Sequence, residues 1–569
     1  MKFNCRFFVA VFFVVQILFH SSVTQAQSAF VPLGNDTYQF LDRLEIKSGI
    51  MLTDLHSSVK PFRRDDIIKS VHQFDTIYPA IHLTRMDGKN LEFLDNDNSE
   101  WIDSDTINSN HPVYYFYRTK ADFYSTKSED FMLKINPVIE FGMGADSFKD
   151  GRRFTNTRGV DARGWIAQKV AFYIYIGENQ ARYTRYVQNY TTKAGAVPGE
   201  GYFKNFKGTG VDFLTTRGYI DFTAAKFINI TFGRDKNFFG NGYRSLQLSD
   251  FSEDYLFLRL KTHIWKLEYT NVFADLTSDF LRGGDRLLPK KFAAFHHLSL
   301  NATKFLNIGL FEGVVFHRKD GFEFQYLVPV IFYRGVEQGL GSPDNAFIGG
   351  DLKINFLRAF SIYGQLMIDD LNLTALRSGN GYWANKLGTQ IGIKYVDAFT
   401  VENLDLQFES NWVRPYTYSH YDSVSNYTHY NQPLAHPLGA NFNEMIVIAR
   451  YQPAPNFWMT AKWFDIFIGQ DSIIGSGSSA HYTNFGSNIQ FLGTENTVNA
   501  IYGNKIGQGV NTHLTIGELT LTYRLRHNLF IDAGITYRAA YSPVHRYDEG
   551  VVYGYTSVRL NIPQRLHEF

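Results

Sequence analysis

The sequence predicts an all-β transmembrane barrel of about 18 antiparallel strands, preceded by a small α-helical N-terminal domain. From about residue 113 onward, apolar and polar residues alternate with a period of two, and tight turns alternate with long polar connections. Beyond the first residues, no apolar run reaches the length of a membrane-spanning helix, although 16% of the residues are aromatic. A mean hydropathy of -0.23 fits a barrel, because lipid-facing and lumen-facing residues alternate along its strands.

The first 26 residues read as a secretory signal peptide. Lys2 and Arg6 precede the apolar run 7–19, and the small residues Thr24 and Ala26 predict cleavage after Ala26. A membrane anchor is the alternative, but an anchor needs about 20 apolar residues and this run is shorter. The only cysteine is Cys5, so the mature chain is expected to contain no disulfide, thiolate metal site or thiol nucleophile.

For residues 27–112 we predict a small helical domain that either lies in the periplasm or plugs the barrel. Apolar residues recur at helical spacing in three segments, beginning with Tyr38, Leu41 and Leu44. The second segment starts near Pro61, and the third contains Leu91 and Leu94. Such short helices must pack on one another or on a larger body.

Residues 113–569 predict the barrel itself. Eighteen strand candidates run from "FMLKINPVIEFGMG" (131–144) to "YGYTSVRLNI" (553–562), an even number as in single-chain bacterial barrels. Residues 113–125 are expected to form a connector, because a further strand would make the number odd. The terminal Phe569 resembles the C-terminal assembly signal of outer-membrane barrels.

The segment "FGRDKNFFGNGYRSLQLSDF" (232–251) is the first candidate site. It lacks the spacing of a nucleotide-binding loop, and its glycines indicate a structured loop. Charged and amide side chains beside aromatic rings are typical of sugar binding. We therefore predict polysaccharide contacts at the barrel mouth or lumen by Arg234, Asp235, Asn237, Asn241 and Arg244.

The segment 409–442 is the second candidate site. Its mixture of aromatic and amide residues predicts polysaccharide contacts by Trp412, Arg414, Tyr416 and Tyr418. The alternative is an extracellular loop folded back over the barrel. His420, His429 and His436 are too widely spaced in a loop to indicate a metal site, and no metal or cofactor is expected.

Two further segments bear on channel and enzyme functions. The apolar segment 325–345 is expected to fold into the lumen and narrow any channel, unless it is a barrel strand. His296 and His297 lie in one strand and should point to opposite faces. No Gly-x-Ser-x-Gly or His-Glu-x-x-His motif occurs, so the protein is not expected to be an enzyme. A formal charge of +1 without basic clusters argues against nucleic acid as a partner.

Four segments carry a resemblance to a known family: "VPLGNDTYQFLDRLEIKSG", "LHSSVKPFRRDDI", "FGRDKNFFGNGYRSLQLSDFSEDYLFLRLKTHIWKLEYTN" and "RPYTYSHYDSVSNYTHYNQPLAHPLGANF". Over roughly 31–569 the chain resembles the Wzi-type capsule assembly proteins of the outer membrane, especially the Bacteroidetes branch that includes the gliding-motility protein RemB. The resemblance implies an eighteen-stranded outer-membrane barrel with a helical domain at its periplasmic end.

The resemblance also implies a function. Such a protein binds or anchors capsular or extracellular polysaccharide at the cell surface, supports capsule assembly and is linked in this branch to gliding motility. Its expected partners are the polysaccharide, outer-membrane lipid, and periplasmic or surface proteins. A channel or exporter for polysaccharide is the alternative. The family's Gly-Arg and Gly-rich signatures match Gly233–Arg234 and the segment 240–245, and no ligand role transfers to them residue by residue.

Overall fold

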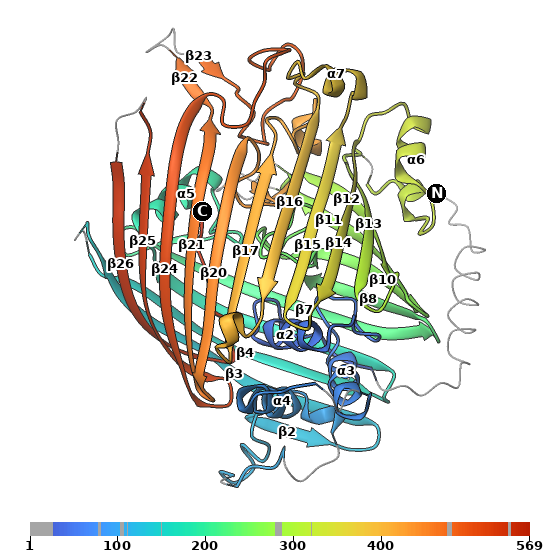
Figure 1. Ribbon diagram of the computed structural model, residues 1–569, viewed down its shortest axis with the longest axis vertical. Coiled ribbons are helices and arrows are strands. Elements are labelled where there is room, and N and C mark those ends of the chain that lie inside the picture. The colour runs from blue at the N-terminus through green and yellow to red at the C-terminus, as the bar shows by residue number, and fades with distance from the viewer. Residues whose placement is uncertain are drawn as a thin grey trace.

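The computed structural model shows a closed, antiparallel β-barrel (Figure 1). It describes residues 27–77, 81–102, 107–110, 112–148, 151–278, 287–319, 321–474, 481–543 and 548–569. The expected signal peptide, residues 1–26, lies outside the described residues. The barrel strands are β3 (Phe131–Asp146), β4 (Arg153–Ile166), β5 (Val170–Arg182), β7 (Gly210–Ala225), β8 (Ile228–Asp235), β10 (Tyr255–Ile264), β11 (Leu267–Thr277), β12 (Lys290–Asn301), β13 (Leu306–Phe316), β14 (Asn345–Phe356), β15 (Phe360–Asp370), β16 (Lys386–Tyr395), β17 (Leu404–Val413), β20 (Phe442–Ala454), β21 (Phe457–Gln470), β24 (Val510–Arg526), β25 (Leu529–Tyr541) and β26 (Asp548–Leu560).

These eighteen strands confirm the predicted number and the predicted fold class. Each strand pairs antiparallel with the next, and β26 closes the ring on β3 with Leu560 opposite Ile139. Of the connector at 113–125, only Tyr124 and Ser125 enter a strand, the short β2 (Tyr124–Lys127), which pairs with β3. A second short strand, β6 (Lys204–Phe206), pairs with β7.

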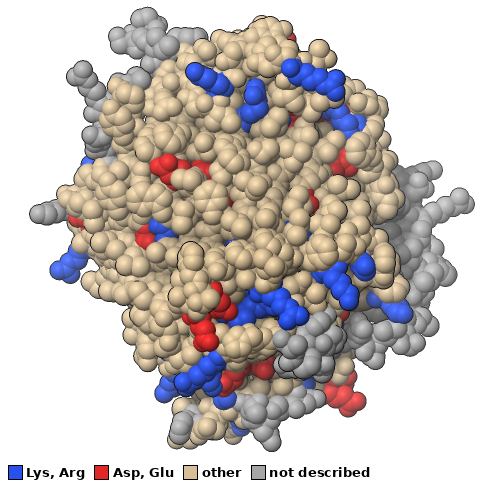
Figure 2. Space-filling model, in the orientation of Figure 1, with Lys and Arg blue, Asp and Glu red and all other residues tan. Residues whose placement is uncertain are grey.

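Successive side chains in the strands alternate between the lumen and the outer wall. In β13, Ile308 and Leu310 point outward and are 40% and 60% exposed, whereas Phe311 and Val315 point inward and are buried. His296 and His297 in β12 point to opposite faces, as predicted: His296 contacts Tyr333 outside, and His297 contacts Asp351 inside. The outer wall is therefore apolar and the inner wall carries the polar side chains, as a membrane barrel requires. Much of the outer surface seen in Figure 2 is free of charged side chains, which gather mainly toward its top and bottom.

Tight turns and long connections alternate between the two ends of the barrel. At one end, strands are joined by short turns such as 167–169, 265–266 and 455–456. At the other end, long segments connect them, including 183–209, 236–254, 317–344, 414–441 and 471–509. Among the described helices, none has the length and apolar composition needed to cross a membrane.

Three N-terminal helices lie at the tight-turn end of the barrel (Figure 1). They are α2 (Thr37–Ser48), α3 (Arg64–Ile77) and α4 (Arg85–Asp97), followed by the short η1 (Ser99–Trp101). Ion pairs fasten them to the inner wall: Lys353 of β14 contacts Asp42 and Glu45 at 2.7 Å, and Lys134 of β3 contacts Glu100 at 2.6 Å. The helices therefore block this end of the lumen.

The remaining short elements lie in the N-terminal region, in the long connections and, for one 3-10 turn, between β16 and β17 at the tight-turn end. These are β1 (Val59–Lys60), which pairs with β9 (Phe238–Phe239), the hairpins β18 (Thr428–His429) with β19 (Gln432–Pro433) and β22 (Ser472–Ile474) with β23 (His481–Thr483), the helices α5 (Arg185–Ala194), α6 (Tyr333–Gly339) and α7 (Leu373–Ser378), and the 3-10 turns η3 (Phe324–Leu327), η4 (Ala398–Thr400) and η5 (Ser423–Ser425).

The prediction that segment 325–345 enters the lumen was wrong. Its residues up to 344 form the connection between β13 and β14, and its middle packs on the outer wall, where α6 lies beside the barrel in Figure 1. The side chains it covers, Val314 and Phe316, share the outward face of β13 with Leu310. An apolar segment has two apolar environments available in a membrane barrel, the packed interior and the outer wall, and this segment uses the second.

The terminal Phe569 also differs from expectation. Strand β26 ends at Leu560, and the last nine residues turn back into the barrel, where the C-terminus is marked in Figure 1. Phe569 is 9% exposed and packs against Tyr186, Tyr190 and Phe251. The terminal aromatic residue therefore belongs to the interior and not to a barrel strand.

Candidate functional site

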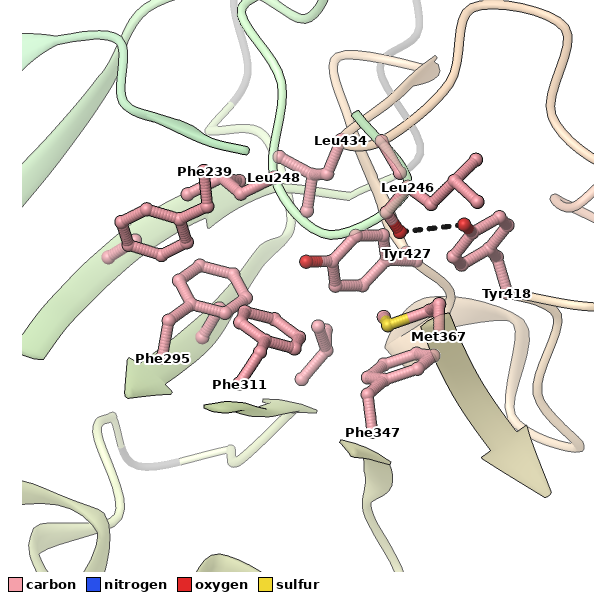
Figure 3. Close-up of a cluster of buried hydrophobic side chains, with 14 of the residues drawn as sticks. Phe239, Leu246, Leu248, Phe295, Phe311, Phe347, Met367, Tyr418, Tyr427 and Leu434 are labelled. Atoms are coloured by element: carbon pink, nitrogen blue, oxygen red, sulfur yellow. Dashed lines mark hydrogen bonds between the residues drawn. The ribbon is translucent and has the colours of Figure 1, made fainter. Parts of the chain in front are cut away.

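The two candidate segments meet inside the long-loop end of the barrel. We call residues 236–254 and 414–441 the plug. Their buried side chains join inward-facing strand residues in one cluster (Figure 3). The labelled members are Phe239, Leu246, Leu248, Tyr418, Tyr427 and Leu434 from the plug, and Phe295, Phe311, Phe347 and Met367 from the wall.

Backbone and tyrosine hydrogen bonds lock the two halves of the plug together. Tyr418 Oη donates to Leu246 O at 2.7 Å (Figure 3), and Tyr427 Oη donates to Gln247 O at 2.6 Å. The Ser249 backbone N–H donates to Leu434 O at 2.8 Å. A buried carbonyl without a partner is costly, so these bonds specify how the halves fit. The plug also pairs with the N-terminal region, since Gly240 N donates to Ser58 O at 2.7 Å.

A charged network surrounds Arg244 at the inner edge of the plug. Its guanidinium donates to the Glu568 carbonyl at 2.5 Å and to the Glu444 carboxylate at 3.3 Å, while its backbone N–H donates to Glu409 at 3.0 Å. Burial alone would lower the pKa of Arg244, but the carboxylates of Glu444 and Glu568 raise it above its ordinary value. For Tyr243, in contrast, burial itself raises the pKa. The Tyr243 hydroxyl donates to Glu568 at 2.5 Å.

The C-terminal tail, residues 561–569, runs through the lumen and holds this network. Glu568 pairs with Lys462, and this lysine and Arg244 keep the pKa of Glu568 below its ordinary value although burial opposes them. Arg565 donates to Asn179 at 2.6 Å and Thr157 at 2.9 Å on the opposite wall. A cavity of about 600 Å³ remains between the tail, the plug and the N-terminal helices. Sequence reasoning missed the tail, although the polar residues Arg565, His567 and Glu568 after the last apolar strand were a signal for it.

Two predicted site residues lie on the outward face of their strands and not on the lumen face. Arg234 lies in β8 opposite the exposed Leu256 of β10 and pairs with Glu253. Trp412 lies in β17, on the face opposite that of the buried Glu409 and Asn411. The reason is that 409–413 is strand and not loop: in "LDLQFESNWV" the lumen-facing positions are the polar ones.

The other residues predicted in the first segment are turned inward. Asp235 faces the lumen, 3.8 Å from Arg217. Asn237 is 1% exposed and accepts from Arg259 at 2.9 Å, and Asn241 is 4% exposed and accepts from Ser57 at 2.9 Å. The structure therefore brings Asn237, Asn241 and Arg244 into the closed interior.

The residues predicted in the second segment differ in their exposure. Tyr416 and Tyr418 are each 1% exposed and adopt positive φ angles of 66° and 73°, which large side chains rarely adopt. Arg414 is half-buried and donates only to carbonyl oxygens, Asn385 O at 2.7 Å and Tyr382 O at 3.3 Å. Burial lowers the pKa of Arg414, and no carboxylate among the described residues pairs with it.

The three histidines of the plug lie apart and have separate partners. His436 Nε2 lies 2.7 Å from Glu444, and His429 Nδ1 accepts from the Thr277 backbone at 2.9 Å. His420 Nδ1 accepts from the Asp422 backbone at 3.3 Å. Within the ranges that the structure describes, no three His, Cys, Asp or Glu side chains are placed to hold a metal ion.

Comparisons with known proteins show the fold. No protein-family model and no curated protein sequence matches the chain. Among solved structures, Wzi from Escherichia coli, described as an outer-membrane protein involved in group 1 capsule assembly and a carbohydrate-binding β-barrel, aligns with a TM-score of 0.58 and 13% identity. That alignment covers 95% of this chain and 100% of Wzi. OprD from Pseudomonas aeruginosa gives a TM-score of 0.41 at 9% identity, over 76% of this chain and 95% of OprD, and OccAB2 from Acinetobacter baumannii gives 0.42 at 7%, over 76% and 99%. The first of these likenesses shows that the chain has, over 95% of its length, the fold of an outer-membrane β-barrel like that of Wzi. The other two are too weak to support an argument.

Proposed function

We propose that the protein is an outer-membrane barrel that binds capsular or extracellular polysaccharide at the cell surface. The observation that carries the proposal is the closed lumen: the N-terminal helices fill one end, and the plug and the tail fill the other. A large polar polymer can then reach only the surface of the long loops. The likeness to Wzi over 95% of the chain supports this proposal, because Wzi is described as carbohydrate-binding.

Most residues first predicted as sugar contacts now have a different proposed role. Asn237, Asn241, Arg244 and Tyr418 fasten the plug to itself and to its surroundings through the bonds described above, and Tyr416 donates to Asn484 O at 3.0 Å. We therefore propose that these residues set the shape of the loop surface. Arg234 and Trp412 lie on the outer wall, where a role beside lipid fits better than contact with a polymer.

Arg414 stays a proposed ligand contact. Its guanidinium lies beside Tyr382 O, and the Tyr382 ring lies 5.7 Å from Tyr502, which is 58% exposed. An arginine with no carboxylate partner among the described residues can bind an acidic sugar through charge-assisted hydrogen bonds, and the Tyr382–Tyr502 pair offers an aromatic face for stacking.

A binding assay tests the proposal. The folded protein in lipid nanodiscs is titrated with the surface polysaccharide of its own host, and binding is expected to weaken at least tenfold in the double variant Arg414→Gln, Tyr502→Ala. Trp265→Ala is the matched control, because Trp265 is 75% exposed in the turn between β10 and β11 at the opposite end. Failure of the wild-type protein to bind any host polysaccharide would refute the function.

The alternative function is a channel or exporter for polysaccharide. The observation that favours it is the cavity inside the barrel. Planar-bilayer recordings separate the two functions. We expect no stable conductance from the intact protein, and a large stable conductance would favour the exporter.

The finer assignment, to capsule assembly and to the Bacteroidetes branch with its gliding role, rests on the sequence resemblance. A deletion strain is expected to shed more polysaccharide and spread less on agar. Unchanged shedding and spreading would remove this part of the proposal.

A further inference from the structure

The connection between β13 and β14 carries a segment on the outer wall that we call the strap, residues 322–340. It contains η3 and α6, and Figure 1 shows α6 outside the barrel beside the β12–β14 wall. The strap is fastened to the wall by aromatic side chains. Phe316 of β13 has its ring centroid 4.8 Å from Tyr326 and 5.0 Å from Phe322.

The strap covers a polar patch on the outer wall. Asn271 of β11, His296 of β12 and Glu312 of β13 are register neighbours that point outward, yet they are 2%, 5% and 8% exposed. The Tyr333 ring lies 3.8 Å from the His296 ring, and the Arg334 backbone N–H donates to Glu312 at 3.0 Å. Three polar side chains facing hydrocarbon would be costly, and the strap removes them from it.

The opposite side of the strap is apolar and exposed. Residues 324–332, "FQYLVPVIF", contain no charge. Five of these apolar side chains are exposed: Phe324 77%, Val328 42%, Val330 82%, Ile331 37% and Phe332 58%. A patch of this kind against water would lose about 25 cal/mol for each Å² of apolar surface left wet.

The exposed apolar wall continues on both sides of the strap at the same height. Ile348 of β14 is the register neighbour of Glu312 and is 40% exposed. Phe232 of β8 is the register neighbour of Leu258, which packs against the strap, and is 49% exposed. Leu310, directly below Glu312 on the same face of β13, is 60% exposed. The strap therefore covers the polar patch and completes the apolar belt around it.

We infer that the strap is a lipid-embedded element that docks the acyl chains of the surrounding outer leaflet through Phe324, Val328, Val330, Ile331 and Phe332. This inference rests on the proposed outer-membrane location. It commits to lipid because the belt that surrounds the strap is the lipid-facing surface of the barrel. The outer leaflet is the relevant one because the strap descends from the long-loop end.

Single-nitroxide labelling tests the inference in liposomes. Cysteine is introduced at Val330 on the strap, at Leu310 on the belt and at Ser378 on the exposed surface of α7, in a Cys5→Ser background. Collision rates with oxygen, which concentrates in lipid, and with a nickel chelate, which stays in water, are measured for each label. We expect the Val330 and Leu310 labels to favour oxygen by about tenfold over the Ser378 label.

Each other outcome has a distinct meaning. A Val330 label in water with the Leu310 label in lipid would overturn the strap inference and leave the membrane location standing. A Leu310 label in water would overturn the membrane location itself. Spin–spin broadening at Val330 that vanishes on dilution with unlabelled protein would show that a second copy, and not lipid, covers the strap.

Discussion

Two loops leave the same end of the barrel and fold in opposite directions. Residues 414–441 turn inward and become half of the plug, whereas the strap turns outward and lies on the wall. The inward loop is rich in Tyr, Asn and His, and the strap contains the uncharged run 324–332. In a soluble protein the apolar loop would be the buried one. In this barrel the lumen stabilises side chains that can hydrogen-bond, and the outer wall stabilises apolar side chains. The polar loop therefore folds inward and the apolar loop folds outward.

The largest expected effect is the loss of a charge inside the plug network. Glu444→Ala removes the carboxylate that contacts His436 and one of the two carboxylates that face Arg244, and a buried pair broken in this way costs about 3–5 kcal/mol. The free energy of unfolding is measured by guanidinium titration in lipid vesicles. Glu323→Ala is the control in the strap, because the Glu323–Arg318 pair at 3.4 Å is partly exposed and should contribute less than about 1 kcal/mol. Equal losses for the two variants would contradict the contrast between the loops.

The next prediction compares the stability cost of substitutions on the two sides of the strap. Tyr333 is fully buried against His296, so Tyr333→Ala is expected to cost about 3 kcal/mol. Val330 is 82% exposed to the surroundings, and in lipid Val330→Ala loses only the transfer of about two methylene-sized groups, about 1.5 kcal/mol. The same titration measures both. A loss from Val330→Ala as large as that from Tyr333→Ala would show that the exposed side of the strap packs against protein.

The inward loop should also be sensitive to acid. Burial lowers the pKa of His429 in the plug to about 3, from an ordinary value of 6.5. As the pH falls, the unfolded chain therefore takes up a proton on His429 before the folded protein does. The contribution of neutral His429 to the free energy of unfolding is complete above about pH 6.5 and is lost as the pH falls toward 3. The limiting slope of the free energy of unfolding is about 1.4 kcal/mol per pH unit. Unfolding titrations between pH 7 and pH 4 measure the slope. His429→Gln should lower the slope by the contribution of one proton. An unchanged slope would show that other groups cause the acid sensitivity.

The sequence predicted the barrel better than the interior, and the physical reason is local periodicity. Alternation in segments such as 306–316 shows strands and faces without any long-range information. The plug and tail depend on contacts between distant residues: Tyr418 meets Leu246, and Glu568 meets Arg244. Nothing local distinguishes a polar loop that enters a polar lumen from one that stays in solvent, or an apolar loop bound for the interior from one bound for the wall.

The boundaries of the second candidate site show the same limit. The mixture of aromatic and amide residues in 409–442 predicts sugar contact by Trp412, yet Trp412 lies in β17, where Glu409 and Asn411 occupy the lumen-facing positions. A polar residue at every second position is what a water-filled or polar-packed lumen demands. Composition thus selected two segments that meet in the structure, but the direction of each side chain required the barrel register.

The smallest expected effect concerns one hydroxyl group of the plug. Tyr418→Phe keeps the ring stacked 5.5 Å from Tyr427 but removes the hydrogen bond to Leu246 O, which is then buried without a donor. The expected loss is about 1 kcal/mol. Tyr421→Phe is the matched control, because Tyr421 is 51% exposed and its hydroxyl only reaches Ser342 O at 3.5 Å, so water can replace the bond. If both variants lost the same small amount, the plug interior would be as wet as the loop surface, and hydrogen bonding within the lumen would not explain why this loop folds inward.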